Sequence, residues 1–175
     1  PRNLALVSTT VGWRMTNPLY PAAWVESLGR SAEIVAEAKG ISRSEQDEWA
    51  LRSHELAAAA WQAGHHDGFV EPVGDIFRDE SIRDTSMERL SRLRPAFSAD
   101  GSVTAGNSSP INDGAVATLI GSREWAAELG TEPLGQIIAS AVVGIEPDRF
   151  ALAPVDAINK LLQQTGHHLD DIAVV

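Results

Sequence analysis

The stretch Val103–Gly114, VTAGNSSPINDG, joins a short β-prone entry to the apolar run Ala115–Ile120. Most of its side chains are small, which allows a ligand or a second backbone to approach closely. Asp113-Gly114 between two strand-like runs is also typical of a hairpin turn or a bulge. The pattern favours a tight turn between two strands and leaves a ligand-contacting loop as the alternative.

After this stretch, predicted strands alternate with predicted helices. Strands are expected at Ala115–Ile120, at Leu134–Val143 and in the terminal run Asp171–Val175, because these runs are short and apolar. A short helix is expected over Ser122–Leu129. A longer one spans Pro154–Gly166, since proline suits the first helical turn and glycine suits the residue after the last. The alternation predicts an α/β layer.

The first part of the chain is predicted to be mainly helical. Residues 1–20 read as loop with some extended character, and Phe69–Arg78 reads as one or two short strands. The segment Pro21–Ala38 carries apolar residues at helical spacing, and Gly40 is placed to end a helix. Gly29 weakens the middle of this segment, so that one helix and two short helices are both compatible with it.

Two capping-box patterns open further helices. In such a box a serine or threonine caps the helix and an acidic residue three positions later reaches back to it. Ser42 with Glu45 predicts a helix that runs to about Ala63. The pattern Thr85–Glu88 predicts a short helix through Leu93. This second helix is either a small amphipathic helix packed on its neighbour or a lid over a phosphate-bearing ligand.

The charge of the chain limits the classes of partner. A formal net charge of −10 and a pI near 4.8 argue against nucleic acid and anionic membranes, because both bind clusters of Lys and Arg. The one basic cluster comprises Arg83, Arg89, Arg92 and Arg94. No apolar run approaches the roughly 18 residues of a membrane span, and no signal-peptide pattern is seen. The sequence therefore predicts a soluble, cytoplasmic protein.

Cysteine is absent, which removes disulfides, thiolate metal sites and a cysteine nucleophile from this span. The runs His65-His66-Asp67 and His167-His168 invite a metal interpretation, because imidazole with carboxylate suits zinc or iron. Adjacent side chains in a turn rarely converge on one ion, and no third ligand follows at a helical interval. We therefore predict solvated turns and no metal site.

Read as motifs, the sequence resembles the thiolase family over essentially its whole length. The central stretch belongs to this resemblance, as does Thr10–Arg14 with Asn17-Pro18 near the start. The other motifs fall in the family's order and spacing. They are Gly40–Arg43, Glu45–Asp47, Ala50–Ser53, Leu93–Phe97, Gly144–Pro147, Ala153–Val155, Ala157-Ile158 and Leu169–Ile172.

The resemblance implies a thiolase-like α/β fold, in which two similar α/β halves form five layers and a largely helical excursion, the loop domain, is inserted in the first half. Residues 1–98 would be the later part of this excursion, covering coenzyme A. Residues 99–121 would be the closing strands of the N-terminal half, and residues 122–175 the opening of the C-terminal half. We accordingly expect the chain to be a fragment of a larger protein.

The resemblance also implies a reaction, acyl transfer between a cysteine thioester and coenzyme A. It runs as 3-ketoacyl-CoA thiolysis, as in β-oxidation of fatty acids, or as acetyl-CoA condensation. Coenzyme A is then a substrate, and no tightly bound cofactor is expected. Because this span has no cysteine, it cannot run the reaction alone, and none of its residues is expected to be catalytic. The family's nucleophile lies upstream of the matched part.

Six positions match residues on the coenzyme A side of the family's site. Arg83 would approach the nucleotide end of coenzyme A. Leu90, Leu93 and Phe97 would line the adenine and pantetheine wall, and Ala105 and Ser109 would lie beside the pantetheine amides. Arg89 stands where the family usually has a small polar residue near the nucleotide. The six residues are Arg83, Leu90, Leu93, Phe97, Ala105 and Ser109.

Two classes of function stay open at this point. In the first, the chain is part of a thiolase enzyme whose partners are acyl-CoA, coenzyme A and the remainder of the thiolase chain, in a homo-oligomer of the kind common in the family. In the second, it is a non-catalytic thiolase-like subunit or scaffold that binds acyl-CoA or lipid, or pairs with a catalytic partner chain. A plain interaction domain is a third interpretation.

Overall fold

The computed structural model describes residues 16–174, and its helices account for all of the regular secondary structure in that range. The chain divides into two compact units, each described separately below. The first contains residues 16–110 together with Glu146–Ala151, and the second contains Ile111–Ile145 and residues 152–174. The predictions for residues 1–15 and for Val175 lie outside the described residues.

The first unit begins with two helices in place of one long helix. A 3-10 turn, η1 (Ala22–Trp24), precedes α1 (Leu28–Lys39), so the segment forms two pieces. The break lies at residues 25–27 and not at Gly29, which lies inside α1. The side chain of Ser27 caps α1 by accepting a hydrogen bond from the amide of Arg30 at 3.2 Å. Gly40 ends the helix with φ +66°, in the left-handed region that glycine adopts readily.

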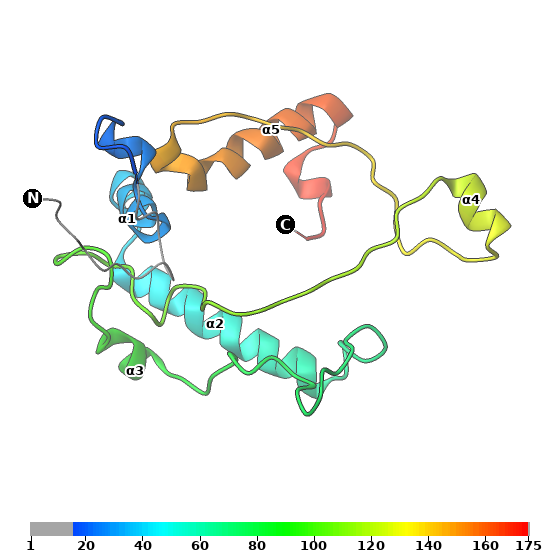
Figure 1. The fold of residues 1–175 in the computed structure, drawn as a ribbon, viewed down its shortest axis with the longest axis horizontal. Coiled ribbons are helices and arrows are strands. Elements are labelled where there is room, and N and C mark those ends of the chain that lie inside the picture. The colour runs from blue at the N-terminus through cyan, green and yellow to red at the C-terminus, as the bar shows by residue number, and fades with distance from the viewer. Residues whose placement is uncertain (1–15, 175) are drawn as a thin grey trace, which may run out of the picture. The chain divides into compact units, whose positions relative to one another are not determined.

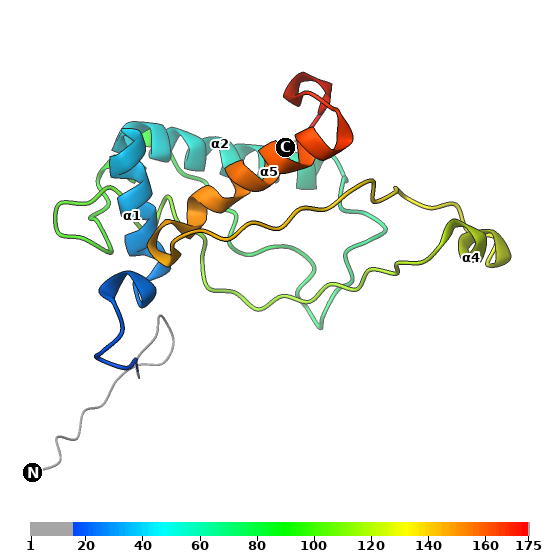
Figure 2. The same cartoon turned by 90° about the horizontal axis from the view of Figure 1, so that it is seen from above.

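The second helix, α2 (Arg43–Gln62), confirms the first capping box. The hydroxyl of Ser42 accepts from the amide of Glu45 at 3.3 Å, and a carboxylate oxygen of Glu45 accepts from the amide of Ser42 at 2.8 Å. These bonds hold the pKa of Glu45 below its usual value. In Figure 2, α1 and α2 run in clearly different directions and are joined by the short turn at Gly40.

The third helix, α3 (Met87–Ser91), is shorter than predicted and has a different cap. Ser86, and not Thr85, caps it by accepting from the amide of Arg89 at 3.3 Å, so the predicted box is wrong by one residue. The helix also stops before Leu93. The carbonyls of Leu90 and Leu93 instead accept hydrogen bonds from the guanidinium of Arg43 on α2. The helix packs against α2, as its amphipathic pattern predicted.

The second unit contains two further α-helices. The helix α4 (Arg123–Glu128) is capped by Ser122, and α5 (Ala153–Thr165) carries Pro154 in its first turn and ends at Gly166, as predicted. Two further 3-10 segments are η2 (Pro147–Leu152), most of which belongs to the first unit, and η3 (Leu169–Asp171). Among residues 16–174, no helix combines the length and apolar character that a membrane crossing needs.

The predicted strands do not form in residues 16–174. Two isolated bridges, Val73 with Ile76 and Pro95 with Thr104, are the β-type pairings present there. Figure 1 draws the segments before and after α4 as extended chain without strand arrows. Residues 111–122 contain no strand and no turn, so no hairpin forms at Asp113-Gly114. A strand needs hydrogen bonds to a neighbour, and the segments predicted as strands have none in this part of the chain. Their apolar side chains are exposed, with Val116 at 92%.

The contact of Gly29 with Phe97 leads to the first prediction. A Cβ atom at position 29 of α1 would overlap the ring of Phe97. Replacing glycine by alanine inside a helix normally stabilises by about 0.5–1 kcal/mol, but overpacking costs about 1–3 kcal/mol. We therefore expect Gly29→Ala to lower the free energy of unfolding by about 1 kcal/mol, measured by urea titration with circular dichroism.

The control is the same substitution in a Phe97→Ala background, where the ring is gone. There Gly29→Ala should be neutral or stabilising, and the double-mutant cycle isolates the contact. A Gly29→Ala variant more stable than the parent chain would contradict the packing described here.

Candidate functional site

The first unit has a pocket of about 190 Å³ between α2, α3 and the central stretch. Three parts of the chain form it: the middle of α2, the segment from residue 81 to Leu93, which includes α3, and residues 105–110. Its lining residues are His54, Ser81, Arg83, Thr85, Arg89, Leu90, Leu93, Ala105, Gly106, Ser108 and Pro110.

One wall of the pocket is apolar and tightly built. Leu90 is buried, and Leu93 follows three residues later, past the end of α3. Gly106 approaches both leucines so closely that a Cβ atom there would lie 2.6 Å from Leu90 Cδ2 and 2.5 Å from Leu93 Cδ1. Real Cβ atoms do not approach other atoms so closely, so glycine is what allows the central stretch to close against α3.

The lining of the pocket also includes basic and polar residues. Arg89 donates to the carbonyl of Asp84 at 3.0 Å, and the Asp84 carboxylate lies 4.0 Å from it. The amide of Arg83 donates to Nδ1 of His54 at 3.3 Å. Within residues 16–174 the guanidinium of Arg83 has no carboxylate at ion-pair distance. Arg83 is therefore available to a ligand that carries negative charge.

A buried carboxylate on α1 holds the entry to the central stretch. Glu33 is 6% exposed, and its two oxygens accept from the amide of Ser102 at 3.0 and 2.9 Å, from the amide of Val103 at 2.9 Å and from the hydroxyl of Ser102 at 3.0 Å. Burial by itself raises the pKa of Glu33, but these hydrogen bonds together outweigh it and hold the pKa below its usual value.

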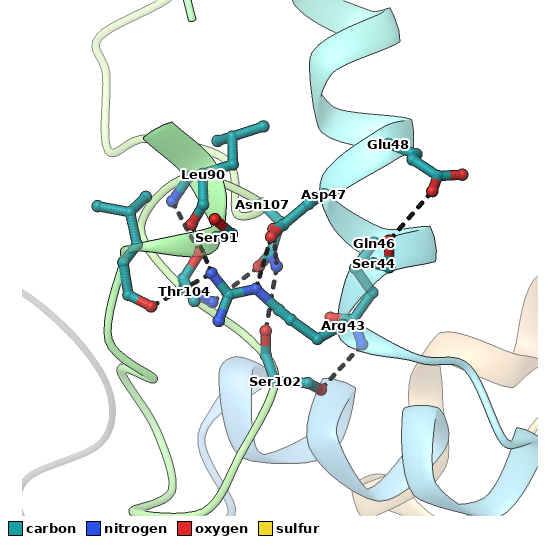
Figure 3. Close-up of polar contacts among 12 residues, drawn as sticks. Arg43, Ser44, Gln46, Asp47, Glu48, Leu90, Ser91, Ser102, Thr104 and Asn107 are labelled. Carbon is teal, nitrogen blue, oxygen red and sulfur yellow. Dashed lines mark hydrogen bonds and ion pairs between the residues drawn. The ribbon is translucent and has the colours of Figure 1, made fainter. Parts of the chain in front are cut away.

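A second network holds the rest of the turn from α2. Figure 3 shows the side chains of Arg43 and Asp47 projecting from α2 toward α3 and the turn. Asp47 pairs with Arg43 at 2.8 Å and accepts from the side-chain amide of Asn107 at 3.0 Å. The oxygen of that same amide accepts from the amide of Thr104 at 2.7 Å. The backbone of the turn is thus fixed by side chains from two helices.

The structure brings together four of the six residues predicted for the site. Arg83, Leu90, Leu93 and Ala105 line the pocket. Ser109 does not line it, although its neighbours Ser108 and Pro110 do.

The sixth predicted residue, Phe97, lies against Gly29 of α1 and is also absent from the lining. A role for Phe97 and Ser109 in binding stays a prediction.

Sequence reasoning missed His54 and Gly106 as members of this site. His54 meets Arg83 across 29 residues of sequence, so no local pattern announces the contact. The signal for Gly106 was present in the small residues of the central stretch. Arg89 was visible as part of the basic cluster, although that cluster also contains Arg92 and Arg94, which do not line the pocket.

The histidine run considered for a metal has a different environment. The ring of His66 lies 4.4 Å from that of Trp61 and 5.5 Å from that of Phe69, measured between centroids. Within residues 16–174, no group of three His, Asp or Glu side chains is placed to hold a metal ion.

Comparison with known proteins gives consistent similarities. A sequence model of the family described as "Thiolase, N-terminal domain" matches residues 9–124. Over 99% of its length, the chain is 38% identical to the 3-oxoadipyl-CoA/3-oxo-5,6-dehydrosuberyl-CoA thiolase of Escherichia coli K12, of which it covers 46%. Over 84% of its length, it is 43% identical to a probable acetyl-CoA acyltransferase of Staphylococcus aureus, of which it covers 40%.

A solved structure is similar as well. The acetyl-CoA acetyltransferase of Bacillus anthracis matches 90% of this chain with a TM-score of 0.76 and 36% sequence identity, and the match covers 41% of that protein. The chain therefore spans less than half the length of the relatives that it matches.

Glu33 leads to the second prediction. Glu33→Gln replaces one acceptor oxygen by a donor that faces the amides of residues 102–103, so we expect a loss of about 2 kcal/mol in the free energy of unfolding at neutral pH. Because the pKa of Glu33 is lowered in the folded chain, its contribution is fully present above the ordinary value of 4.5 and is lost as the pH falls through the lowered pKa. Urea titrations at several pH values measure both effects.

The difference between Glu33→Gln and the parent chain should therefore shrink below pH 4.5, the ordinary glutamate value. Glu37→Gln is the matched control, since Glu37 lies on the same helix and is exposed. A difference for Glu33→Gln that stays constant down to the acid unfolding transition would rule out this role of the carboxylate.

Proposed function

Because the chain belongs to the thiolase family, we propose that it forms the coenzyme A-binding side of a thiolase-type acyltransferase. The observation that carries the proposal is the pocket of the first unit, which two arginines and two leucines line together. Coenzyme A combines phosphate groups, an adenine ring and a pantetheine arm with two amides. Arginine suits the phosphates, because its planar fork donates to their oxygens, and leucine suits the ring and the arm.

The charge distribution of the chain supports this assignment. The whole chain carries a formal charge of −10, which by itself disfavours an anionic ligand. Arg83 and Arg89 place positive charge locally, because both line a pocket that Leu90 and Leu93 also line. A ligand with a phosphate end and an apolar body matches both kinds of residue at once.

The size of the pocket supports a partial site. A volume of about 190 Å³ lies below the roughly 300–1,000 Å³ of sites that enclose a whole drug-sized ligand. In the proposal, Arg83 meets the nucleotide end, Leu90 and Leu93 line the wall, and Ala105 and the neighbouring Ser109 lie beside the pantetheine amides. The remainder of the ligand would contact residues outside this pocket.

The proposed reaction needs a nucleophile that this chain does not contain. In acyl transfer of this type a cysteine thiolate attacks the thioester carbonyl carbon of an acyl-CoA and forms a carbon–sulfur bond to the enzyme. The carbon–sulfur bond to coenzyme A breaks, and coenzyme A leaves as its thiolate. The chain has no cysteine, so the thiolate would come from the remainder of a longer thiolase chain or from a partner chain. The present span contributes binding and orientation of coenzyme A.

The third prediction concerns Arg83. Arg83→Ala should weaken binding of coenzyme A to the 175-residue chain by about tenfold or more, because a hydrogen bond to a charged group contributes roughly 1.5–3 kcal/mol and 1.4 kcal/mol is tenfold in affinity. Isothermal titration calorimetry measures the affinity. Arg92→Ala is the matched control, since Arg92 belongs to the same basic cluster but pairs with Glu88 outside the pocket.

Equal weakening by Arg83→Ala and Arg92→Ala would mean that only overall charge attracts the ligand. No binding of coenzyme A by the parent chain, with circular dichroism showing that it is folded, would refute the proposed function.

The fourth prediction concerns catalysis. The 175-residue chain alone should not cleave acetoacetyl-CoA in the presence of coenzyme A, because it lacks the thiolate. Loss of the absorbance of the acetoacetyl enolate measures the reaction, because the product acetyl-CoA lacks the 3-keto group. Activity should require a cysteine-bearing thiolase segment, supplied in the same chain or as a partner.

Thiolysis by the chain alone would refute the assignment of the nucleophile elsewhere. Coenzyme A binding that gives no activity with any cysteine-bearing segment encoded beside it would favour the second class of function, a non-catalytic acyl-CoA-binding subunit.

A further inference from the structure

Asp47 is a buried carboxylate on α2, and its two oxygens serve two different parts of the pocket (Figure 3). The residue is 1% exposed, so water does not compete for these oxygens. Oδ2 faces Arg43 and Oδ1 faces Asn107. The two branches that begin at these oxygens end at two neighbouring walls of the pocket, which meet where Gly106 closes against the leucines.

The first branch leads to α3. Arg43 Nε donates to Asp47 Oδ2 at 2.8 Å, which fixes the plane of the guanidinium. Arg43 Nη2 then donates to the carbonyl of Leu90 at 2.6 Å and to that of Leu93 at 3.2 Å. Leu90 and Leu93 form the apolar wall of the pocket. Asp47 therefore holds this wall through a single intermediate side chain.

The second branch leads to the turn. Asn107 Nδ2 donates to Asp47 Oδ1 at 3.0 Å and to the carbonyl of Ser102 at 3.1 Å, while Asn107 Oδ1 accepts from the amide of Thr104 at 2.7 Å. The hydroxyl of Thr104 in turn accepts from the amide of Gly106 at 3.1 Å. Gly106 is the residue that closes against the leucine wall.

We propose that Asp47 is a positioning residue that sets the spacing between the leucine wall and the Ala105-Gly106 wall of the pocket. Its effect on ligand affinity rests on the coenzyme A-binding function proposed above. Asp47 does not line the pocket, so it acts on the ligand only through Arg43 and Asn107.

Stability alone does not account for this carboxylate. A buried ion pair contributes little net stability, because the cost of removing both charges from water offsets their attraction. An apolar side chain of similar volume would fill the same space, but it would offer no acceptor to Arg43 or to Asn107. The carboxylate instead orients two partners at once, because one oxygen accepts from Arg43 and the other accepts from Asn107.

The orientation of the Asp47 oxygens matters for binding because Gly106 packs closely against the two leucines. The turn and the leucines are already at the limit of close approach, so a shift of either wall changes the shape of the pocket. We therefore expect ligand affinity to respond to Asp47 even when the chain remains folded.

The test compares Asp47→Asn with the parent 175-residue chain. A carboxamide turns a donor toward either Arg43 or Asn107, which breaks one branch, and loses the charge that strengthens the other. We expect the amide resonances of both walls to move in ¹H–¹⁵N spectra without ligand: those of Ser91 and Arg94 beside the leucine carbonyls, and those of Thr104 and Gly106 in the turn. Affinity for coenzyme A should fall about tenfold, at a temperature where circular dichroism shows a folded chain.

The matched control is Glu88→Gln. It removes the charge of another i,i+4 ion pair, Glu88 with Arg92, in which both side chains are 74% exposed and neither lines the pocket. It should leave the turn amides and the affinity unchanged. A purely structural role for Asp47 would lower the melting temperature of Asp47→Asn and leave the affinity of its folded form at the parent value, which would overturn the proposal.

A second variant applies if Asp47→Asn does not fold. Arg43→Lys keeps a positive charge beside Asp47 but removes the fork that reaches the leucine carbonyls. It should move the amides of Ser91 and Arg94, leave those of Thr104 and Gly106 in place, and weaken coenzyme A several-fold. Movement of the turn amides alone, or an unchanged affinity, would overturn the proposal.

The two proposals fail in different ways. If the folded parent chain and Glu88→Gln both fail to bind coenzyme A, the proposed function is wrong, and Asp47 is then judged on the ligand-free amide shifts. If the parent chain binds and Asp47→Asn moves the amides of only one wall, the function stands and the positioning role is wrong.

Discussion

The first unit depends on two buried carboxylates that hold a turn of backbone. Glu33 from α1 and Asp47 from α2 act on residues 102–107, directly or through Asn107. Of the described residues that are buried, Ala36, Leu90 and Val103 are apolar, whereas Ser31, Glu33, Asp47 and Thr104 are polar or charged. Buried polar groups are costly unless they are hydrogen-bonded. In residues 16–174 every buried side-chain nitrogen and oxygen has a partner, so the turn is held by directed bonds more than by apolar packing.

This arrangement explains how a loop of small residues becomes one wall of a pocket. Small side chains offer little apolar area, so packing alone holds such a loop weakly. Here the helices supply much of the order. Glu33 of α1 binds main-chain amides of the turn directly, and Asp47 of α2 holds Asn107, a side chain of the turn that binds the amide of Thr104. Gly106 then closes against Leu90 and Leu93. The same small residues that permit a close approach therefore require external support to stay in place.

The sequence predicted the helices well because their signals are local. Ser42 with Glu45, the proline of the first turn of α5 and the glycine stops at Gly40 and Gly166 all act within a few residues of the helix end that they define. The cap of α3 was misplaced by one residue, since Thr85 and Ser86 both suit the role and only the surrounding structure distinguishes them.

The supports of the turn had no local signal at all. Glu33 meets Val103 across 70 residues and Asp47 meets Asn107 across 60, and both look like ordinary acidic residues of exposed helices. Four pocket residues were found because the family resemblance supplied them, while His54 was missed by every pattern.

The strand predictions were wrong for a related reason. The segments have a suitable composition, but no neighbouring strand within residues 16–174 pairs with them. The runs at 115–120 and 134–143 are apolar and suited to strands, yet Val116, Leu119 and Leu134 are exposed and the segments are unpaired. An apolar pattern indicates that a segment would be stabilised if a neighbouring element covered it. A strand forms only when a neighbouring strand is present to pair with it. The relatives that this chain matches are more than twice as long as the matched part. The apolar runs therefore suit a larger fold, in which neighbouring elements would cover them. The hydrogen bonds from Glu33 and Asp47 to the turn of the first unit need only residues of this chain.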